Sequence, residues 1–510
     1  MSPDSTLMGA LTGLPSLEIL QLLPLIVGGV IFFIPQLRLA LTLSVSVGVV
    51  ELGIALLLLS RFDPALSAFS LVSRVPVVGP LAYHAGIDGL SLLFLLLAVF
   101  LFLMVVVYGA LVRRFRPLNR FLGGVLVMES LVVGQLVTLD LLWFTLLSLG
   151  QTLLAGHLLR AWATSSAEGP AVMRYYHFMG IGLLLLFAAT LLLGWHHAAS
   201  THGPWRFDLP ALAAGSLSPA WQSVIFFLLL YGFAIRVPLF PFHAWLPQVA
   251  EHGTVASGMA ILLGVKTGVF GIFRFLLPLV PDAVWEWHRV VVVVAAAGIF
   301  YSALLALSQS NLRRLMAYAV VSHTSIVIIG LFSLESLAFQ GAALLTINFG
   351  LAVSTLLFTL GIVHLRTGTM LLPRLGALFE PLPWVSVAFL VGSLAVAGMP
   401  GTPGFDAAHL VLEATTLRLG ALVTITAALG NVAAVSCLLW AFQRAFLAAP
   451  DSRHQRNFAI ARATPAETVI LAVMVLVQVV VGFHSEPWFK LVDQASLELA
   501  GRYHHRHEGE

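Results

Sequence analysis

Long apolar runs, separated by short polar stretches, dominate this chain. A helix needs about 20 mainly apolar residues to cross the hydrocarbon layer of a membrane. Fourteen runs approach that length, so the pattern predicts an all-α polytopic membrane protein with about 14 transmembrane helices. The runs cover residues 17–35, 38–60, 88–112, 119–138, 139–160, 175–195, 221–240, 254–278, 288–308, 312–334, 337–365, 383–418, 418–447 and 464–484.

The composition supports this prediction and excludes a soluble enzyme. Of the 510 residues, 59% are hydrophobic and 10% are charged, whereas soluble proteins carry about 25% charged residues. The single cysteine, Cys437, excludes a disulfide framework and any iron–sulfur or cysteine-ligated zinc site held by this chain alone. The net charge of +3 is scattered over loops, so no nucleic-acid partner is expected.

Arginine placement predicts the orientation, because loops rich in arginine stay on the cytoplasmic side. The loops after odd-numbered runs hold most arginines, which places both termini on the outer side of a bacterial inner membrane. Asp4 and Glu18 flank the start of the first run, so no cleavable signal is expected. The polar tail RYHHRHEGE is expected to be disordered. The arginines are Arg38, Arg113, Arg114, Arg116, Arg120, Arg160, Arg174, Arg313, Arg314, Arg366, Arg374, Arg444, Arg453, Arg456 and Arg462.

The seventh and twelfth runs contain helix breakers. Proline removes an amide donor, so the freed carbonyls need partners in protein or in water. Paired interruptions of this kind indicate a transporter's pathway, although simple kinks are the alternative. The breakers are Pro238 and Pro241 in the seventh run, and Pro400, Gly401 and Pro403 in the twelfth.

The two interruptions lie five runs apart, which predicts two five-helix repeats. An odd number of helices inverts the second copy in the membrane. The predicted organisation has three N-terminal helices in residues 1–118, repeats in 119–278 and 288–447, and a last helix with a polar tail in 448–510.

Lys266 is the main candidate for chemistry at membrane depth. It lies halfway along the run 254–278, roughly 15 Å or more from either end, whereas a lysine stem spans roughly 6 Å. Burying an unpaired ammonium group costs about 2.5–3.5 kcal/mol or more. Burial favours the neutral amine, so Lys266 is predicted to be a switchable proton carrier, with a static structural lysine as the alternative.

Other ionisable residues within the runs are weaker candidates for a proton path. Arg236 precedes the first interruption and can act only as a fixed charge. His323 can exchange protons near neutral pH or simply pack in the core. Glu129 is the carboxylate of the first repeat, and Glu51 lies outside the repeats. Asp406 follows the second interruption and lines a half-channel or faces the outer water.

Four sequence stretches carry a resemblance to a known family. The stretches VPLFPFHAWLP and LLGVKTGVFGIFRF, followed by SNLRRLMAYAVVSH and SLAVAGMPGTPGF, resemble the antiporter-like membrane subunits of proton-translocating NADH:quinone oxidoreductase, complex I. The similarity is greatest to the NuoM type and covers about residues 225 to 410. Related chains of cation/proton antiporters share these motifs. The resemblance implies a proton path of buried charged residues.

The titratable residues of that family are only partly present. Lys266 stands at the family's eighth-span lysine, His323 at its tenth-span histidine, and Arg236 replaces its seventh-span lysine. In the family, a fifth-span glutamate pairs with the seventh-span lysine. We expect Glu129 to supply that carboxylate for Arg236. The family's other titratable positions hold Leu149 in span 5, Phe349 in span 11 and Ala408 in span 12.

Three functions remain open at this stage. The first is a proton-conducting NuoM-like subunit, driven by redox chemistry on other chains. The second is a membrane subunit of a cation-coupled uptake or antiport complex, such as an inorganic-carbon transporter with a peripheral partner. The third is a non-conducting spacer. No phosphate-binding loop or redox cluster is present, so no cofactor or metal is expected on this chain, and its expected partners are other membrane subunits and lipid.

Overall fold

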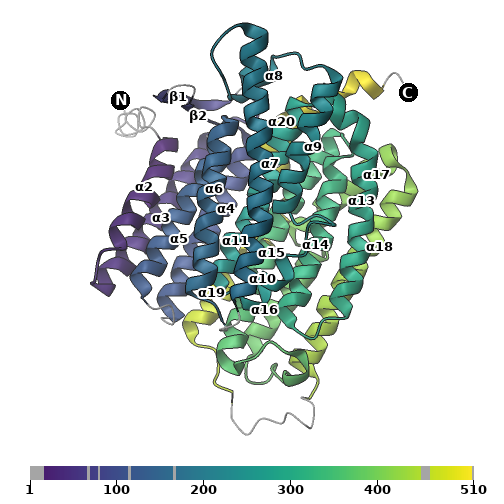
Figure 1. The fold of residues 1–510 in the computed structure, drawn as a ribbon. Helices are drawn as coiled ribbons and strands as arrows, with labels where there is room; N and C mark the ends of the chain where they lie inside the picture. The colour runs from purple at the N-terminus through teal and green to yellow at the C-terminus, as the bar shows by residue number, and fades with distance from the viewer. Residues whose placement is uncertain are drawn as a thin grey trace, which may run out of the picture.

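The structure, a computed structural model, describes residues 16–65, 69–78, 81–112, 117–164, 168–449 and 460–507. Figure 1 shows long helices standing side by side in one bundle. Of the arginines that predict the topology, Arg113, Arg114, Arg116, Arg453 and Arg456 lie outside the described residues.

Twelve helices in the described part of the chain are long and apolar enough to cross a membrane, which confirms a polytopic helical fold. They correspond to twelve of the predicted runs. They are α3 (Leu37–Arg61), α4 (Gly89–Val112), α5 (Leu118–Val137), α6 (Leu141–Ala161), α7 (Gly169–Thr201), α9 (Pro219–Arg236), α11 (Val255–Gly271) continued by the π-helix η1 (Ile272–Leu276) and α12 (Leu277–Leu279), α13 (Pro281–Leu307), α14 (Leu312–Leu331), α15 (Ser336–Thr367), α18 (Ala421–Phe442) continued by the π-helix η3 (Gln443–Leu447), and α19 (Pro465–Phe483).

The first and twelfth runs form shorter helices. The first run becomes α2 (Ser16–Ile31), with 16 residues. The twelfth is divided into α16 (Pro383–Val396), with 14 residues, and α17 (Pro403–Leu419), with 17. Each falls below the length of the twelve spans, so the count of fourteen stays a prediction.

One end of the bundle, which we call the hairpin end, carries the extramembranous elements (Figure 1). The strands β1 (Ser70–Val78) and β2 (Leu81–Ile87) pair antiparallel there, with Arg74 opposite His84. Periodicity did not predict this hairpin. The same end holds α8 (Leu209–Ala213) and α20 (Glu486–His507). The remaining short helices are α10 (Leu246–His252), between α9 and α11, and the 3-10 helix η2 (Leu372–Arg374).

The expectation of a disordered C-terminal tail is wrong for its first residues. The helix α20 continues to His507, because its end packs on the bundle. Tyr503 is fully buried and donates a hydrogen bond of 2.6 Å to the Leu277 carbonyl, and Arg502 donates one of 3.3 Å to the Pro278 carbonyl. These contacts satisfy carbonyls at the end of α12 that have no helical partner.

Side-chain caps fix where the central helices begin. The Asp140 carboxylate accepts a hydrogen bond of 2.8 Å from the Trp143 amide at the start of α6. Asn311 does the same for the Arg313 amide, at 3.0 Å, at the start of α14. Such side chains satisfy amides that the first helical turn leaves free.

The helix α11 lies in the interior and contacts α4, α5, α6, α9 and α15. Two glycines let α9 approach it closely. A Cβ atom at Gly268 would lie 2.7 Å from the Val237 side chain, and one at Gly271 would lie 2.3 Å from the Phe233 ring. Small residues at such spacing allow close helix packing in membranes. The fold therefore places the helix that carries Lys266 in the centre of the bundle.

Candidate proton path

Lys266 is buried in the middle of α11, with 5% of its surface exposed. Within the part of the chain that the structure describes, its ammonium group donates no hydrogen bond and joins no ion pair. Its Nζ atom lies 5.9 Å from the centre of the Phe349 ring, so its closest recorded partner is an aromatic face. The predicted mid-helix burial of Lys266 is therefore present without a compensating carboxylate.

Arg236, the last residue of α9, is held by neutral groups. Its Nε donates a hydrogen bond of 3.1 Å to the Gly264 carbonyl on α11. Its Nη2 donates to Oε1 of Gln135 at 2.8 Å, to Oγ1 of Thr267 at 3.1 Å, and to Oε1 of Gln151. Through Thr267 and the Gly264 carbonyl, the guanidinium group is anchored to α11, the helix that carries Lys266.

The two glutamines join α5 and α6 around this guanidinium group. Gln135 donates a hydrogen bond of 2.9 Å from its Nε2 to Oε1 of Gln151, and Ser148 donates one of 3.0 Å to Oε1 of Gln135. The three side chains are at most 2% exposed. We call Gln135, Gln151, Ser148 and Thr267 the amide cradle. It stabilises a buried cation with dipoles that cannot take up or release a proton at ordinary pH.

The expected pairing of Glu129 with Arg236 is wrong. Glu129 is fully buried on α5, and its carboxyl group interacts with Glu51 on α3. No hydrogen bond to either carboxyl group is present among the described residues. Glu129 points away from the cradle because residues on one helix separate by 100° per position, and Gln135 occupies the face toward α9. Glu129 therefore belongs to an acidic pair with Glu51.

His323 packs against the same aromatic ring, Phe349, that Lys266 approaches. Its ring centre is 4.8 Å from that of Phe349, and its side chain is 2% exposed. Neither ring nitrogen has a hydrogen-bond partner in the described residues. The structure therefore brings Lys266 and His323 to the same aromatic ring, at the position where the family's eleventh-span histidine would stand.

The interruptions predicted from proline and glycine coincide with helix ends. The carbonyl of Ile235, before Pro238 and Pro241, accepts a hydrogen bond of 3.0 Å from Nε1 of Trp245. At the second interruption, Asn348 donates one of 2.8 Å to the Ala395 carbonyl, and Asn431 donates one of 3.0 Å to that of Ala397. In these contacts, protein side chains donate hydrogen bonds to carbonyls next to the two interruptions.

Asp406 lies in the first turn of α17 and accepts a hydrogen bond from the Ser485 hydroxyl, in the turn between α19 and α20. His409 and Glu413, further along α17, are exposed and 3.8 Å apart. These contacts place Asp406 in a group separate from the Lys266 and Arg236 contacts described above.

Sequence reasoning missed the amide cradle. On α6, the residue that reaches Arg236 is Gln151, two positions beyond Leu149, which is 37% exposed. Gln135 and Gln151 are polar amides within apolar helices, and this pattern could have predicted that they contact another polar group. Polar side chains in membrane helices usually face other helices or water.

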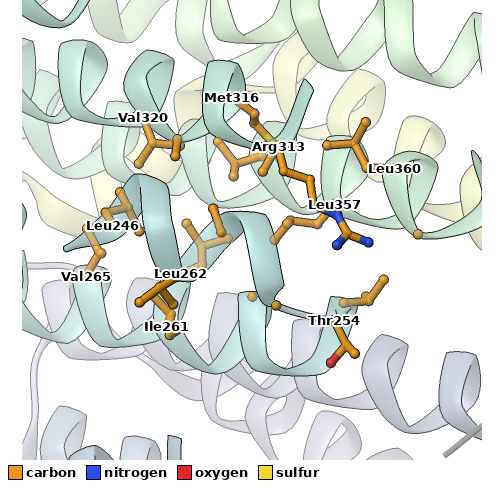
Figure 2. A pocket seen from close by; sticks show the side chains of 18 residues that line it. Leu246, Thr254, Ile261, Leu262, Val265, Arg313, Met316, Val320, Leu357 and Leu360 are labelled. Atoms are coloured by element: carbon orange, nitrogen blue, oxygen red, sulfur yellow. The ribbon is translucent and has the colours of Figure 1, made fainter. Parts of the chain in front are cut away.

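A cavity of about 60 Å³ lies along the N-terminal part of α11 (Figure 2). It lies between α10, α11, α14 and α15, and its wall on α11 extends from Thr254 to Val265, the residue before Lys266. Arg313 and Thr254 are the polar side chains at its edge, and the rest of the lining is apolar. The space is large enough for water, which needs roughly 15 Å³ per molecule.

The profile of the family described as "NADH:quinone oxidoreductase/Mrp antiporter, TM" matches residues 138–433 of this chain. The chain belongs to this family. Subunit M of the F(420)H(2) dehydrogenase of Methanosarcina mazei is 31% identical over 440 residues, covering 85% of this chain and 88% of that protein. Subunit M of the NADH-quinone oxidoreductase of Mycobacterium tuberculosis is 24% identical, covering 95% and 94%.

Among solved structures, a chain of respiratory complex I from Thermus thermophilus with bound NADH superimposes with a TM-score of 0.83. It is 26% identical, and the match covers 95% of this chain and 99% of that one. The chain is thus an antiporter-like, proton-translocating membrane subunit of the NuoM type, as its motifs indicated. The inorganic-carbon alternative is not favoured by these comparisons.

Proposed function

We propose that this chain moves protons across a bacterial inner membrane through Lys266, within a redox-driven complex. Arg236 serves as a fixed positive charge beside the path, and His323 is the next titratable group beyond Phe349. Glu129 and Asp406 lie outside this central route and contribute at its margins. The observation that carries the proposal is a mid-helix ammonium group without a paired carboxylate among the described residues.

The arrangement favours release of the Lys266 proton. A buried ammonium group without a counter-ion is destabilised, whereas the neutral amine is not. The Arg236 guanidinium is anchored to the same helix through Thr267 and keeps its positive charge. The cradle stabilises Arg236 without neutralising it. A change of charge in a neighbouring subunit therefore shifts Lys266 between its ammonium form and its neutral amine form.

Protons reach Lys266 through the cavity of Figure 2, from the predicted cytoplasmic side. The cavity follows α11 from Thr254 to the turn that carries Lys266. Its apolar lining holds water weakly, which allows a chain of waters to form and break during the cycle.

The wider architecture in this proposal has fourteen crossings, two inverted five-helix repeats and both termini on the outer side. An even number of crossings returns the chain to the side on which it started. The caps Asp140 and Asn311 open the second helix of each repeat, which supports an internal repetition. The interruptions after α9 and α16 occupy the fourth position in each.

The partners are other membrane subunits, which carry or contact the electron-transfer chains. Similar proteins belong to complexes named for NADH-quinone and F(420)H(2) oxidation, so the electron donor belongs to one of these two classes. In this proposal the redox centres lie on partner chains, and this chain holds no cofactor or metal of its own. A peripheral partner belongs to the electron-input module rather than to this subunit.

The test uses inverted membrane vesicles that contain the native complex. Proton uptake per electron donor oxidised is measured with a pH-sensitive dye, with NADH and F(420)H(2) supplied in turn. Lys266→Met is expected to abolish the share of proton uptake that passes through this subunit, because methionine keeps the volume and loses the amine.

The matched control is Lys490→Met, which replaces the chain's other lysine. Lys490 is 68% exposed on α20 and pairs with Glu486 at 2.6 Å. Assembly of each variant is checked by the yield of intact complex. Equal proton uptake in Lys266→Met and the parent would support the spacer function and refute the proposal.

A further inference from the structure

A polar cavity of about 380 Å³ opens at the hairpin end of the bundle, at the opposite end of the Lys266 helix from the cavity of Figure 2. Its walls come from the start of α4, from α8, from η1 and α12, and from α20, which covers it. The volume accommodates roughly ten water molecules at the density of the liquid. Its charged lining residues are Asp88, Arg274, Glu498 and Arg502.

The ion pair of Asp88 and Arg274 lines this cavity, which we call the outer cavity. Nη2 of Arg274 donates hydrogen bonds of 2.6 Å to Oδ1 of Asp88 and 2.9 Å to Oγ of Ser91. Arg274 is 6% exposed, and its Nε has no hydrogen-bond partner among the described residues. A buried donor of this kind beside a cavity is normally satisfied by water.

Arg274 and Lys266 lie on the same helix, and Phe270 separates them. The three residues are spaced by four, so they form a stripe along one side of α11 and η1. The Arg274 guanidinium lies 5.1 Å from the centre of the Phe270 ring, which packs on Phe94 at 5.5 Å. About 12 Å of helix, at 1.5 Å per residue, joins the lysine to the wet cavity.

We infer that the cavity beneath α20 is a second, outward water path to Lys266, which the Phe270 ring closes in this conformation. The inference rests on the proposed function, because it gives the Lys266 proton an exit that does not use α13 to α18. The far half favours such a bypass, since Phe349 and Ala408 replace titratable residues there. The π-helix η1 assists the opening, because its wider turns loosen the backbone next to Phe270.

The proton transfers balance without any redox step. When Phe270 rotates and water enters, an N–H bond of the Lys266 ammonium breaks, and the amine keeps the electron pair. The proton forms an O–H bond with a water molecule and passes through the water of the cavity to the Glu498 carboxylate, while Asp88 stays paired with Arg274. Burial and the charge of Asp88 raise the pKa of Glu498, which suits it to take up that proton before releasing it to the outer water.

The test measures passive proton leak in vesicles that contain the whole complex, with an imposed pH gradient and no electron donor. Phe270→Ala is expected to raise the leak several-fold, because it opens the path between the outer cavity and Lys266. The control is Phe275→Ala, on the adjoining π-helix η1, whose buried ring packs on Phe144 at 5.2 Å, whereas the Phe270 ring packs against the Arg274 guanidinium. The double variant with Lys266→Met is expected to return to the parent's leak.

A second measurement locates the path. In a Cys437→Ser background, Ser496→Cys places a thiol on the α20 wall of the cavity. A membrane-impermeant thiol reagent added on the outer side is expected to suppress the Phe270→Ala leak. If Phe270→Ala does not assemble, Phe270→Leu replaces it with a smaller expected increase.

Three results would overturn the inference. They are an equal leak in Phe270→Ala and Phe275→Ala, a leak that survives Lys266→Met, and a leak that the thiol label leaves unchanged. Each of them is independent of the proposed function, because donor-driven proton uptake in the otherwise unmodified chain would still depend on Lys266.

Discussion

Arg236 and His323, buried in the two halves of the bundle, have different surroundings. In the half formed by α5 to α11, Arg236 donates to four acceptors, two of them glutamine amides. In the half formed by α13 to α18, His323 has an aromatic neighbour and no hydrogen-bond partner among the described residues. The first half holds a charge in place. The second holds an imidazole packed on an aromatic ring.

The comparison shows how a chain of this fold can hold a buried cation without a carboxylate. Neutral amides satisfy a buried arginine, so Leu149 is tolerated at the family's glutamate position. The aromatic ring of Phe349 packs against both Lys266 and His323.

The largest effect is expected when the cradle is broken. Gln151→Leu removes an acceptor of Arg236 and the partner of Gln135, which costs about 2–4 kcal/mol of stability and most of the proton transport. Thermal unfolding of the purified chain and the yield of intact complex measure it. Glu129→Gln serves as the control, because Glu129 contacts Glu51 instead. Equal losses in both variants would contradict the separation of the acidic pair from the cradle.

A smaller effect is expected on how stability depends on pH, and it should distinguish the cap Asp140 of α6 from the cap Asn311 of α14. Burial raises the pKa of Asp140 to about 6, and the nearby Asp208 adds to the shift. Since the folded-state pKa lies above the unfolded value, ionised Asp140 lowers stability above about pH 6, and the penalty fades as the pH falls toward 4. Asp140→Asn keeps the cap and should raise the free energy of unfolding at pH 7.5 by at most about 3 kcal/mol. A higher melting temperature at that pH is the measurement that checks it.

The reverse substitution in the other half provides the control for this prediction. Asn311→Asp puts an acid next to Glu251, whose carboxylate now accepts a hydrogen bond of 3.3 Å from Asn311. We expect this variant to lose stability at pH 7.5 and to recover it on acidification. A flat pH profile in all three proteins would show that neither cap titrates in the folded state.

The smallest effect is expected from restoring a titratable group in the second half. Phe349→His places an imidazole between Lys266 and His323 and should raise the proton flux through this subunit about fivefold, or about 1 kcal/mol in the barrier. Phe358→His, on the same helix but packed on Tyr108 at 5.4 Å, is the matched control. A flux in Phe349→His no higher than in this control would mean that His323 is not on the path.

Much of the fold follows from local pattern. Apolar runs long enough to span a membrane predicted twelve of the helices, because in lipid the backbone must satisfy its hydrogen bonds within each segment. Proline and glycine predicted where the seventh and twelfth runs stop being helical. The depth of Lys266 followed from its distance to the ends of its run. The hairpin and the ordered α20 were missed, since both depend on contacts with the outer ends of distant helices.

By itself, the sequence determined which twelve segments are long and apolar enough to span a membrane, and that Lys266 lies far from either end of its apolar run. Only the tertiary structure decided which side chains meet. Gln135 and Gln151 reach Arg236 across 101 and 85 positions of chain, and Glu129 turns to Glu51 instead. The physical reason is that periodicity gives the depth of a residue along its helix, whereas its partners depend on how each helix is rotated and packed against its neighbours.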